Sequence, residues 1–165
     1  KGRGRALKKA WLESTADIVS YMDVDLSTDL EALPRLLAAV EQEGYDIAIG
    51  SRLAKGARVV RSAKREFTSR AYNLLIKTLF PGVQFHDAQC GFKALSRRTV
   101  QELVPLVRNN NWFFDSELLL LAHRKAFRIR EIPVTWAEDP DTRVKVLRTA
   151  WEDIKGLLRI RFRRL

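Results

Sequence analysis

Apolar residues along the chain fall into short continuous runs and into longer stretches with helical spacing. The continuous runs have the length of buried strands and lie at 17–22, 46–50, 91–95 and 128–136. Elsewhere apolar positions recur every three or four residues, which predicts helices at 6–11, 28–43, 66–80 and 115–125 and from about 144 onward. Strands that alternate with helices predict an α/β fold with a mainly parallel sheet.

Several residues mark the expected ends of these elements. Ser27 or Thr28 can cap the helix that follows the first strand, and Gly44 ends that helix. Ser96 can cap a further helix after the third strand. The basic segment 55–65 has little periodic apolar pattern, so we expect a mobile surface loop there.

The composition is that of one globular domain. The 165 residues are 46% apolar and 30% charged and show no internal repeat, so we interpret residues 1–165 as a single domain. Lysine and arginine number 30 against 20 acidic residues, and the formal charge of +10 favours nucleic acid, phosphorylated substrates or an acidic membrane surface as partners. Cys90 is the only cysteine, which excludes an intrachain disulfide.

Two aspartates, Asp23 and Asp25, close the first predicted strand. Residues two apart in a strand point to the same face, and ligands of open α/β sheets bind at the carboxyl ends of strands. Two hard oxygen ligands there suit a divalent cation that holds the diphosphate of a nucleotide. The alternative is a pair of solvated loop carboxylates, one of them a helix cap. A calcium-binding EF-hand loop fits poorly, because Thr28 and Pro34 stand where it needs Gly and Glu.

Arg52 directly follows the second predicted strand, so its guanidinium should reach the same crevice. The planar guanidinium of arginine suits phosphate oxygens of either a donor or an acceptor. For one basic residue among 30, an ordinary solvated charge is the competing interpretation.

Four motifs, in this order, resemble family 2 glycosyltransferases, and most closely their polyprenyl-phosphate (dolichyl-phosphate) mannosyl- and glucosyltransferases. They are MDVDLSTD at 22–29, GSR at 50–52, DAQCGFK at 87–93 and FDSEL at 114–118. The resemblance implies a GT-A-type, Rossmann-like fold with a mixed, mainly parallel sheet flanked by helices. It also implies that the family's first βαβ portion, which holds the nucleotide base, would precede Lys1, so that the chain is the C-terminal portion of a catalytic domain.

The resemblance further implies an activity. The expected reaction is metal-dependent, inverting transfer of a hexose from a sugar nucleotide of the GDP-mannose or UDP-glucose type to a polyprenyl phosphate, at the cytoplasmic face of a membrane. Asp23 and Asp25 would bind Mg²⁺ or Mn²⁺. Some relatives have a metal-assisting Gln four residues after the first Asp, and Ser27 stands there in this chain.

By the same resemblance, Asp87 and Asp115 are the candidate catalytic carboxylates, and Asp115 matches the general base of much of the wider family. A polyprenyl phosphate is already ionised near neutral pH, so these carboxylates could instead bind sugar hydroxyls or orient Lys93. Lys93 and Glu117 are the sugar-binding candidates, although Glu117 would face a different side of the helix from Asp115. The alternative role for Asp115 is the N-cap of its own helix.

Phosphate-binding candidates come from two further places. Arg65, beyond the basic segment, resembles a family arginine with a role similar to that of Arg52. Arg143 and Lys145 lie in a segment that resembles the one near the acceptor phosphate in the family.

The stretch 151–165 predicts a basic amphipathic helix. Its apolar residues near one face are Ile154, Leu157, Leu158 and Phe162. Basic residues crowd the rest, so the helix is suited to peripheral contact with an anionic membrane. The alternative is an ordinary terminal helix that packs on the sheet.

Two other function classes compete with a transferase. Haloacid-dehalogenase-like phosphatases also end a strand with Asp-x-Asp, but they need a late acidic pair after a buried strand, which the strand ending at Trp136 lacks. A basic nucleic-acid-binding module would explain the charge but not the paired aspartates, and no recognition motif is visible, so we expect no nucleic-acid partner.

Overall fold

The computed structural model describes residues 2–138 and 146–162, and its centre is a four-stranded sheet in the order β1-β4-β2-β5. These strands are β1 (Ile18–Met22), β2 (Ile47–Ser51), β4 (Phe92–Ser96) and β5 (Ile129–Pro133). Strands β1, β2 and β5 run in one direction, and β4 runs against both of its neighbours. The mixed, mainly parallel sheet predicted from the sequence is therefore confirmed.

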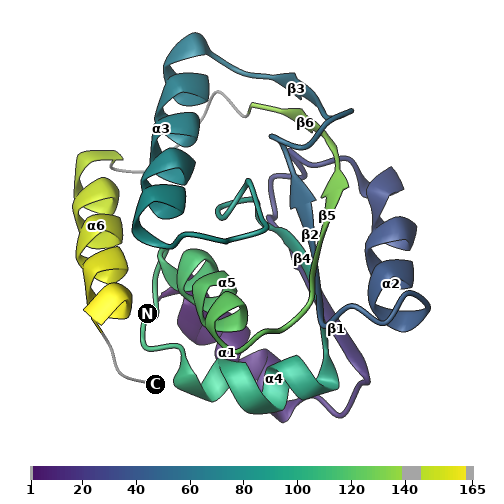
Figure 1. Ribbon diagram of the computed structural model, residues 1–165. Helices are drawn as coiled ribbons and strands as arrows, with labels where there is room; N and C mark the ends of the chain where they lie inside the picture. The colour runs from purple at the N-terminus through teal and green to yellow at the C-terminus, as the bar shows by residue number, and fades with distance from the viewer. Residues whose placement is uncertain (1, 139–145, 163–165) are drawn as a thin grey trace.

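Helices cover both faces of this sheet (Figure 1). They are α1 (Arg3–Glu13), α2 (Leu33–Glu41), α3 (Ala63–Leu79), α4 (Arg97–Leu103), α5 (Phe114–Arg124) and α6 (Val146–Phe162). Helix α2 lies on one face, whereas α5, α1 and α4 lie on the other, with α3 and α6 beyond α5. Short 3-10 turns, Leu30–Ala32 and Val104–Leu106, lead into α2 and follow α4.

The alternation of side chains along β2 divides the interior into two cores. Ile47 and Ile49 face the larger core with α5, whereas Ala48 faces the smaller core under α2. All five residues of β2 are buried, as expected for a strand covered on both faces. Helix α5 is buried from Phe114 to Ala122, so its apolar residues surround the helix instead of forming one stripe.

A second, two-stranded sheet corrects two predictions. Strand β3 (Arg58–Val60) pairs in parallel with β6 (Thr135–Ala137), so the segment 55–65 is not simply a loop, and the run 128–136 is two strands instead of one. No residue of β3 or β6 is fully buried. Backbone pairing, not an apolar pattern, therefore makes β3 a strand, and the sequence carries little sign of it.

The helix boundaries are also partly corrected. Asp29, not Ser27 or Thr28, caps the turn into α2, because its side chain accepts a hydrogen bond from the Glu31 amide at 2.9 Å. Ser96 caps α4 as predicted, accepting from the Thr99 amide at 3.2 Å. Helix α3 begins at Ala63, about one turn before the predicted start.

Helix α6 packs against α5 and α3 with its inner side and keeps apolar residues exposed on its outer side. Leu157 and Ile160 are fully buried in the larger core, so Leu157 does not belong to an outer apolar face as predicted. An outer stripe with helical spacing remains exposed: Trp151, Ile154, Leu158 and Phe162. None of the helices in the described ranges has both the length and the apolar character needed to cross a membrane.

Candidate active site

Asp23 and Asp25 lie in a turn that follows β1. The strand ends at Met22, and the Leu26 amide donates to the Asp23 carbonyl at 3.2 Å, closing the turn with Leu26 in the left-handed region at φ 51°. The two carboxylates are therefore related by a turn and not by strand alternation. Asp25 is exposed, and its Oδ1 accepts from the Ser27 amide at 3.0 Å.

Asp23 is the more enclosed member of the pair. Its amide donates to the Gly91 carbonyl at 2.9 Å, and a Cβ on Gly91 would lie 1.8 Å from its carboxylate, so only glycine fits there. Burial raises the pKa of Asp23, Arg3 opposes that shift, and Asp25 adds to it. The two aspartates are thus close enough to repel each other, which favours binding of a cation between them.

Arg3, at the start of α1, binds Asp23 from the other side, and the sequence analysis did not single it out. Its guanidinium donates to Asp23 at 2.8 Å, to Asp115 at 2.7 Å and to the Tyr21 hydroxyl at 3.0 Å. A Cβ on Gly4 would lie 2.6 Å from the Phe114 side chain, so glycine beside Arg3 lets α1 approach α5 closely. The Gly-Arg-Gly sequence at 2–4 is the one local sign of this arrangement.

Asp115 lies in the first turn of α5 and is only 1% exposed. It accepts hydrogen bonds from Arg3 and Tyr21, and the Lys93 ammonium lies 2.8 Å from its Oδ1. Burial alone would raise its pKa, but Lys93 and Arg3 hold the pKa of Asp115 below its usual value. The N-cap alternative is wrong, because Phe113 occupies that position and Asp115 is turned into this cluster.

Lys93 reaches the cluster from β4, where it is fully buried opposite Tyr21 in the β1–β4 register. Residues opposite each other in an antiparallel pair share one face of the sheet. Lys93 and Tyr21 therefore approach Asp115 together. We call Arg3, Tyr21, Asp23, Lys93 and Asp115 the Asp115 cluster.

A second pair, Arg52 and Asp87, lies beside this cluster. Asp87 is fully buried, and its carboxylate accepts three hydrogen bonds from Arg52: from Nε at 2.7 Å, from Nη2 at 2.8 Å and from the backbone amide at 3.0 Å. Burial would raise the pKa of Asp87, but Arg52 lowers it, and Lys93 contributes in the same direction. The Arg52 guanidinium also lies over the Trp136 ring, 5.4 Å from its centroid. The negative charge of Asp23 helps to raise the pKa of Arg52.

The other predicted site residues lie outside these two groups or outside the described residues. Glu117 is fully buried, but its Oε2 accepts from the Asn109 amide at 2.7 Å and from Arg159 at 2.8 Å, on another side of α5 from Asp115. Arg65 pairs with Glu138 at 2.8 Å. Arg143 and Lys145 lie outside the described residues.

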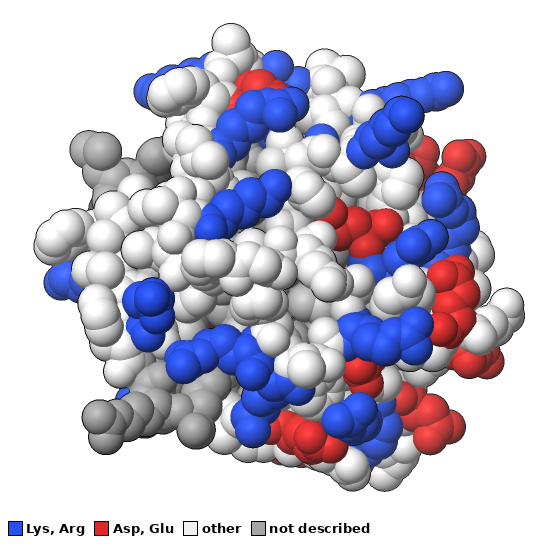
Figure 2. Space-filling model, in the orientation of Figure 1, with Lys and Arg blue, Asp and Glu red and all other residues white. Residues whose placement is uncertain are grey.

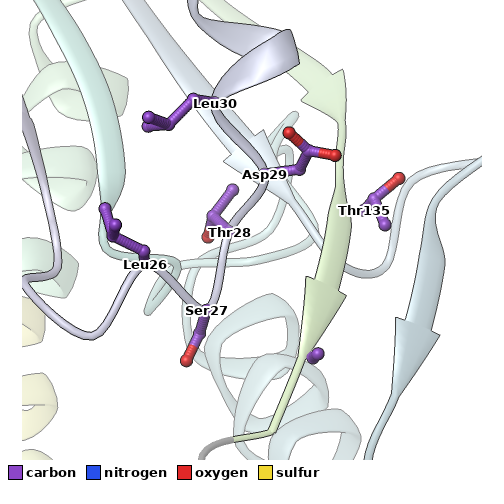
Figure 3. Close-up of a pocket in the computed structure, with 7 residues that line it drawn as sticks. Leu26, Ser27, Thr28, Asp29, Leu30 and Thr135 are labelled. Carbon is purple, nitrogen blue, oxygen red and sulfur yellow. The ribbon is translucent and has the colours of Figure 1, made fainter.

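The chain after Asp25 lines a surface hollow of about 440 Å³. Its lining residues are Leu26, Ser27, Thr28, Asp29, Leu30, Thr135 and Ala137. Figure 3 shows the segment Leu26–Leu30 beside the strand that carries Thr135, and two backbone bonds of 2.9 Å, Asp29 to Thr135 and Ala137 to Ser27, hold the two together. The hollow is next to the acidic turn but contains none of the charged groups of the Asp115 cluster.

The donor set of the acidic turn fits a hard divalent cation. Asp23 and Asp25 supply carboxylate oxygens, the ligands preferred by Mg²⁺ and Mn²⁺. Within residues 2–138 and 146–162, no group of three or more acidic, histidine or cysteine side chains forms a complete metal site. A cation held here would take its remaining ligands from phosphates and water, as Mg²⁺ commonly does.

Comparisons with known proteins identify the family of the chain. The chain matches the family model described as Glycosyl transferase family 2 over residues 1–104. Glycosyltransferase AglD of Haloferax volcanii is 42% identical over 156 residues, which cover 94% of this chain and 24% of that protein. A dolichyl-phosphate beta-glucosyltransferase of Dictyostelium discoideum is 30% identical over 172 residues, covering 100% of this chain and 52% of that protein. The chain thus spans about a quarter of the first relative and about half of the second.

Solved structures confirm the GT-A-type fold. Glucosyl-3-phosphoglycerate synthase of Mycobacterium tuberculosis in complex with UDP superposes with a TM-score of 0.76 at 19% identity, covering 98% of this chain and 55% of that one. The same enzyme in complex with Mn²⁺, UDP and phosphoglyceric acid gives a TM-score of 0.73 at 16% identity, covering 100% of this chain and 56% of that one. At these identities the likeness concerns the fold alone.

Proposed function

The chain belongs to glycosyltransferase family 2, and from this premise we propose that it transfers a hexose from a sugar nucleotide to a polyprenyl phosphate. Relatives named dolichyl-phosphate beta-glucosyltransferase support the acceptor class and favour UDP-glucose over GDP-mannose as the donor. We propose that residues 1–165 form one catalytic domain, the C-terminal portion of a GT-A fold. Membership of this family argues against a haloacid-dehalogenase-like phosphatase. Substrates that carry phosphate groups would account for the basic charge, so we propose no nucleic-acid partner.

The observation that carries this proposal is the set of three donors around Asp115, two of them cationic. A general base works best when its pKa lies near the working pH. Asp115 accepts from Arg3, Tyr21 and Lys93, and its pKa is lowered. Arg52 binds Asp87 and likewise lowers its pKa. Neither carboxylate is suited to accept a proton. An acceptor that is already ionised at neutral pH, such as a phosphate monoester, needs no such base.

The charged side chains then bind and orient the substrates. Asp23 and Asp25 would hold Mg²⁺ or Mn²⁺, and such an ion, when bound, neutralises the charge that develops on the leaving diphosphate. Arg52 uses Nε and Nη2 for Asp87, and we propose that Nη1 binds a phosphate oxygen. A phosphate that attacks opposite the leaving diphosphate inverts the anomeric carbon.

The remaining predicted residues have secondary places in this proposal. Lys93 is close to Asp115 and is proposed to bind a sugar hydroxyl only together with it. Glu117 is engaged by Arg159 and Asn109, so its proposed contribution is to hold the start of α5. Arg65 remains a proposed phosphate ligand that would have to exchange Glu138 for substrate. The same proposal includes Arg143 and Lys145.

We further propose peripheral contact with an anionic membrane at its cytoplasmic face, through the outer stripe of α6. Phe162 is 80% exposed and Trp151 59%, unusual for large apolar side chains. In Figure 2 acidic side chains gather on the right, near α2, and along the bottom, with basic ones between them, whereas the left side shows mainly uncharged side chains with scattered basic ones. An apolar stripe among basic residues suits insertion at an anionic interface.

The deciding experiment uses the full-length protein, Mg²⁺ or Mn²⁺, a polyprenyl phosphate, and labelled UDP-glucose or GDP-mannose. We expect metal-dependent transfer of the label into the lipid phase, with UDP-glucose as the better donor. Donor binding without lipid labelling would reject the polyprenyl phosphate and keep the transferase. If neither donor binds with metal present, the proposal fails.

A further inference from the structure

The loop that carries Asp87 has its backbone fixed by side chains from several elements. We call residues 86–91 the Asp87 loop. The amides of His86 and Asp87 donate to Glu131 of β5 at 2.8 and 3.1 Å, and the Ala88 amide donates to Asn73 of α3 at 3.0 Å. The position of Asp87, and with it that of Arg52, therefore depends on residues far from it in sequence.

Helix α6 holds a side chain of the same loop through Asp153. The side-chain Nε2 of Gln89 donates to Asp153 Oδ2 at 3.0 Å, and the backbone amide of Gln89 donates to Asp87 Oδ1 at 3.3 Å. Asp153 is 3% exposed, and its Oδ1 has no hydrogen-bond partner in the described part of the chain. A buried carboxyl group with an unpaired oxygen is destabilising. An apolar residue, as at Leu157 one turn later, would pack there without that penalty, so the carboxyl group calls for a role besides packing.

One turn beyond Asp153, α6 also touches the start of α5, the helix that carries Asp115. A Cβ on Gly156 would lie 2.3 Å from the Phe113 ring, and Phe113 is two residues before Asp115. Gln89 is likewise two residues after Asp87. The inner face of α6 thus contacts the neighbours of both candidate catalytic carboxylates, while its outer face carries the exposed apolar stripe.

We propose that Asp153 is a positioning residue, which acts through Gln89 to hold the Asp87 loop and the Arg52–Asp87 pair in their phosphate-binding geometry. This inference rests on the proposed function. Because Oδ2 is the atom that Gln89 uses, an asparagine at 153 can supply the same acceptor, whereas an alanine cannot. The hydrogen bond, not the charge, is therefore the essential feature.

The surroundings of Asp153 agree with a role that does not depend on its charge. Burial raises the pKa of Asp153 to about 7, Gln89 opposes the shift, and Glu152 on the same helix adds to it. Tyr72 of α3 faces Asp153 and donates to Ser116 of α5 at 2.8 Å. Among the described residues no cation contributes to this shift. Near neutral pH a large share of Asp153 is therefore uncharged, and its carbonyl oxygen still accepts from Gln89.

The test compares Asp153→Ala, Asp153→Asn, Gln89→Ala and the double alanine variant in the full-length protein. We expect each single alanine variant to lower kcat about 10-fold, because a misplaced catalytic segment slows the reaction. The double variant should lose no more than either single one, and Asp153→Asn should stay within about 2-fold of the unmodified protein. Gln101→Ala, an exposed glutamine on α4, is the matched control.

Alkylation of Cys90 supplies a readout that does not need activity. Cys90 lies in the Asp87 loop, is 1% exposed, and has its thiol pKa raised to about 12 by burial. Its modification, followed by mass spectrometry of the peptide that contains it, should be several-fold faster in Asp153→Ala and unchanged in Asp153→Asn.

The outcomes separate this inference from the proposed function. Unchanged kcat and unchanged Cys90 modification in Asp153→Ala would overturn it, and additive losses in the double variant would overturn the route through Gln89. If Asp153→Ala does not fold, Gln89→Ala, with its partly exposed side chain, decides the matter. If the unmodified protein transfers no sugar, the proposed function fails, while Cys90 modification still tests the contact.

Discussion

The guanidinium of Arg3 lies between the carboxylates of Asp23 and Asp115, 2.8 Å from the first and 2.7 Å from the second. It thereby links the proposed metal-binding turn to Asp115 at the start of α5. Lys93 supplies a second positive charge to Asp115. With Asp25 nearby, three carboxylates face two cations, and the remaining negative charge favours a bound divalent ion.

Replacing Arg3 with alanine should therefore disable the enzyme. We expect kcat to fall about 100-fold or more and the free energy of unfolding to fall by about 2–3 kcal/mol, because Asp115 stays buried with one counter-charge removed. Steady-state kinetics and urea unfolding measure the two effects. Arg5→Ala, an exposed neighbour, is the control. Normal activity in Arg3→Ala would contradict a role for this residue.

Asp25→Asn should abolish turnover while leaving the fold intact. The side chain is exposed and makes one hydrogen bond, to the Ser27 amide, which asparagine can also accept, so stability should change by less than about 0.5 kcal/mol. The lost carboxylate should weaken Mn²⁺ binding in the presence of nucleotide, as measured by electron paramagnetic resonance. Asp17→Asn, also exposed, is the matched control. An active Asp25→Asn enzyme would reject the metal assignment.

The sequence predicted the elements whose burial leaves a pattern, and it missed those set by distant contacts. Strand β2 and helix α5 were placed within a residue or two because nearly every side chain in them is buried. Strand β4 was also found, but its reversed direction could not be, since pairing direction leaves no local pattern. Strand β3 was missed because only its backbone is engaged.

The site shows the same division. Asp23, Asp87 and Asp115 could be named as candidates because they stand in recognisable motifs. Arg3 was missed because it is one of 30 basic residues, and its partner Asp115 is 112 residues away in sequence. Tyr21 looks like an ordinary strand residue, and only the β1–β4 register places it beside Lys93.

The Arg52–Asp87 pair predicts a pH-dependent effect on stability. Burial opposes ionisation of Asp87, but Arg52 lowers its pKa below that of the unfolded chain. The ionised Asp87 therefore contributes fully to stability above about pH 4, and this contribution is lost as the pH falls through the lowered pKa of the folded protein. Arg52→Ala should destabilise the protein by about 3–5 kcal/mol at pH 7, because a fully buried carboxylate loses its partner.

Urea unfolding at pH 7 and at pH 3 checks this, and the deficit of Arg52→Ala should shrink at the lower pH. Arg65→Ala is the matched control, because the Arg65–Glu138 pair has a similar distance of 2.8 Å but is 35% and 21% exposed. It should cost less than about 1 kcal/mol. Equal deficits in the two variants would contradict the importance of burial.

Asp153 predicts a stability change of the opposite sign. Its pKa is raised to about 7 in the folded protein, so its contribution is full below the unfolded value and is lost as the pH rises through about 7. The free energy of unfolding of Asp153→Asn, measured relative to that of the unmodified protein, should increase by on the order of 3 kcal/mol when the pH is raised from 4 to 8. Comparing the two pH values cancels any constant effect of burying the amide. A difference that does not change with pH would mean that Asp153 is not enclosed.

The outer stripe of α6 predicts binding to anionic lipid. Leu158 is 44% exposed, and burying its side chain in an interface would contribute on the order of 1–2 kcal/mol, so Leu158→Glu should lower the affinity for phosphatidylglycerol vesicles at least about 10-fold in co-sedimentation. Leu12→Glu provides a matched control, because Leu12 is 45% exposed but lies on α1. Because basic side chains surround the stripe, binding to phosphatidylcholine should be weaker and binding to anionic vesicles should decline with salt. Equal losses in Leu12→Glu and Leu158→Glu would show that the binding is general apolar adhesion and would remove α6 from the proposed membrane contact.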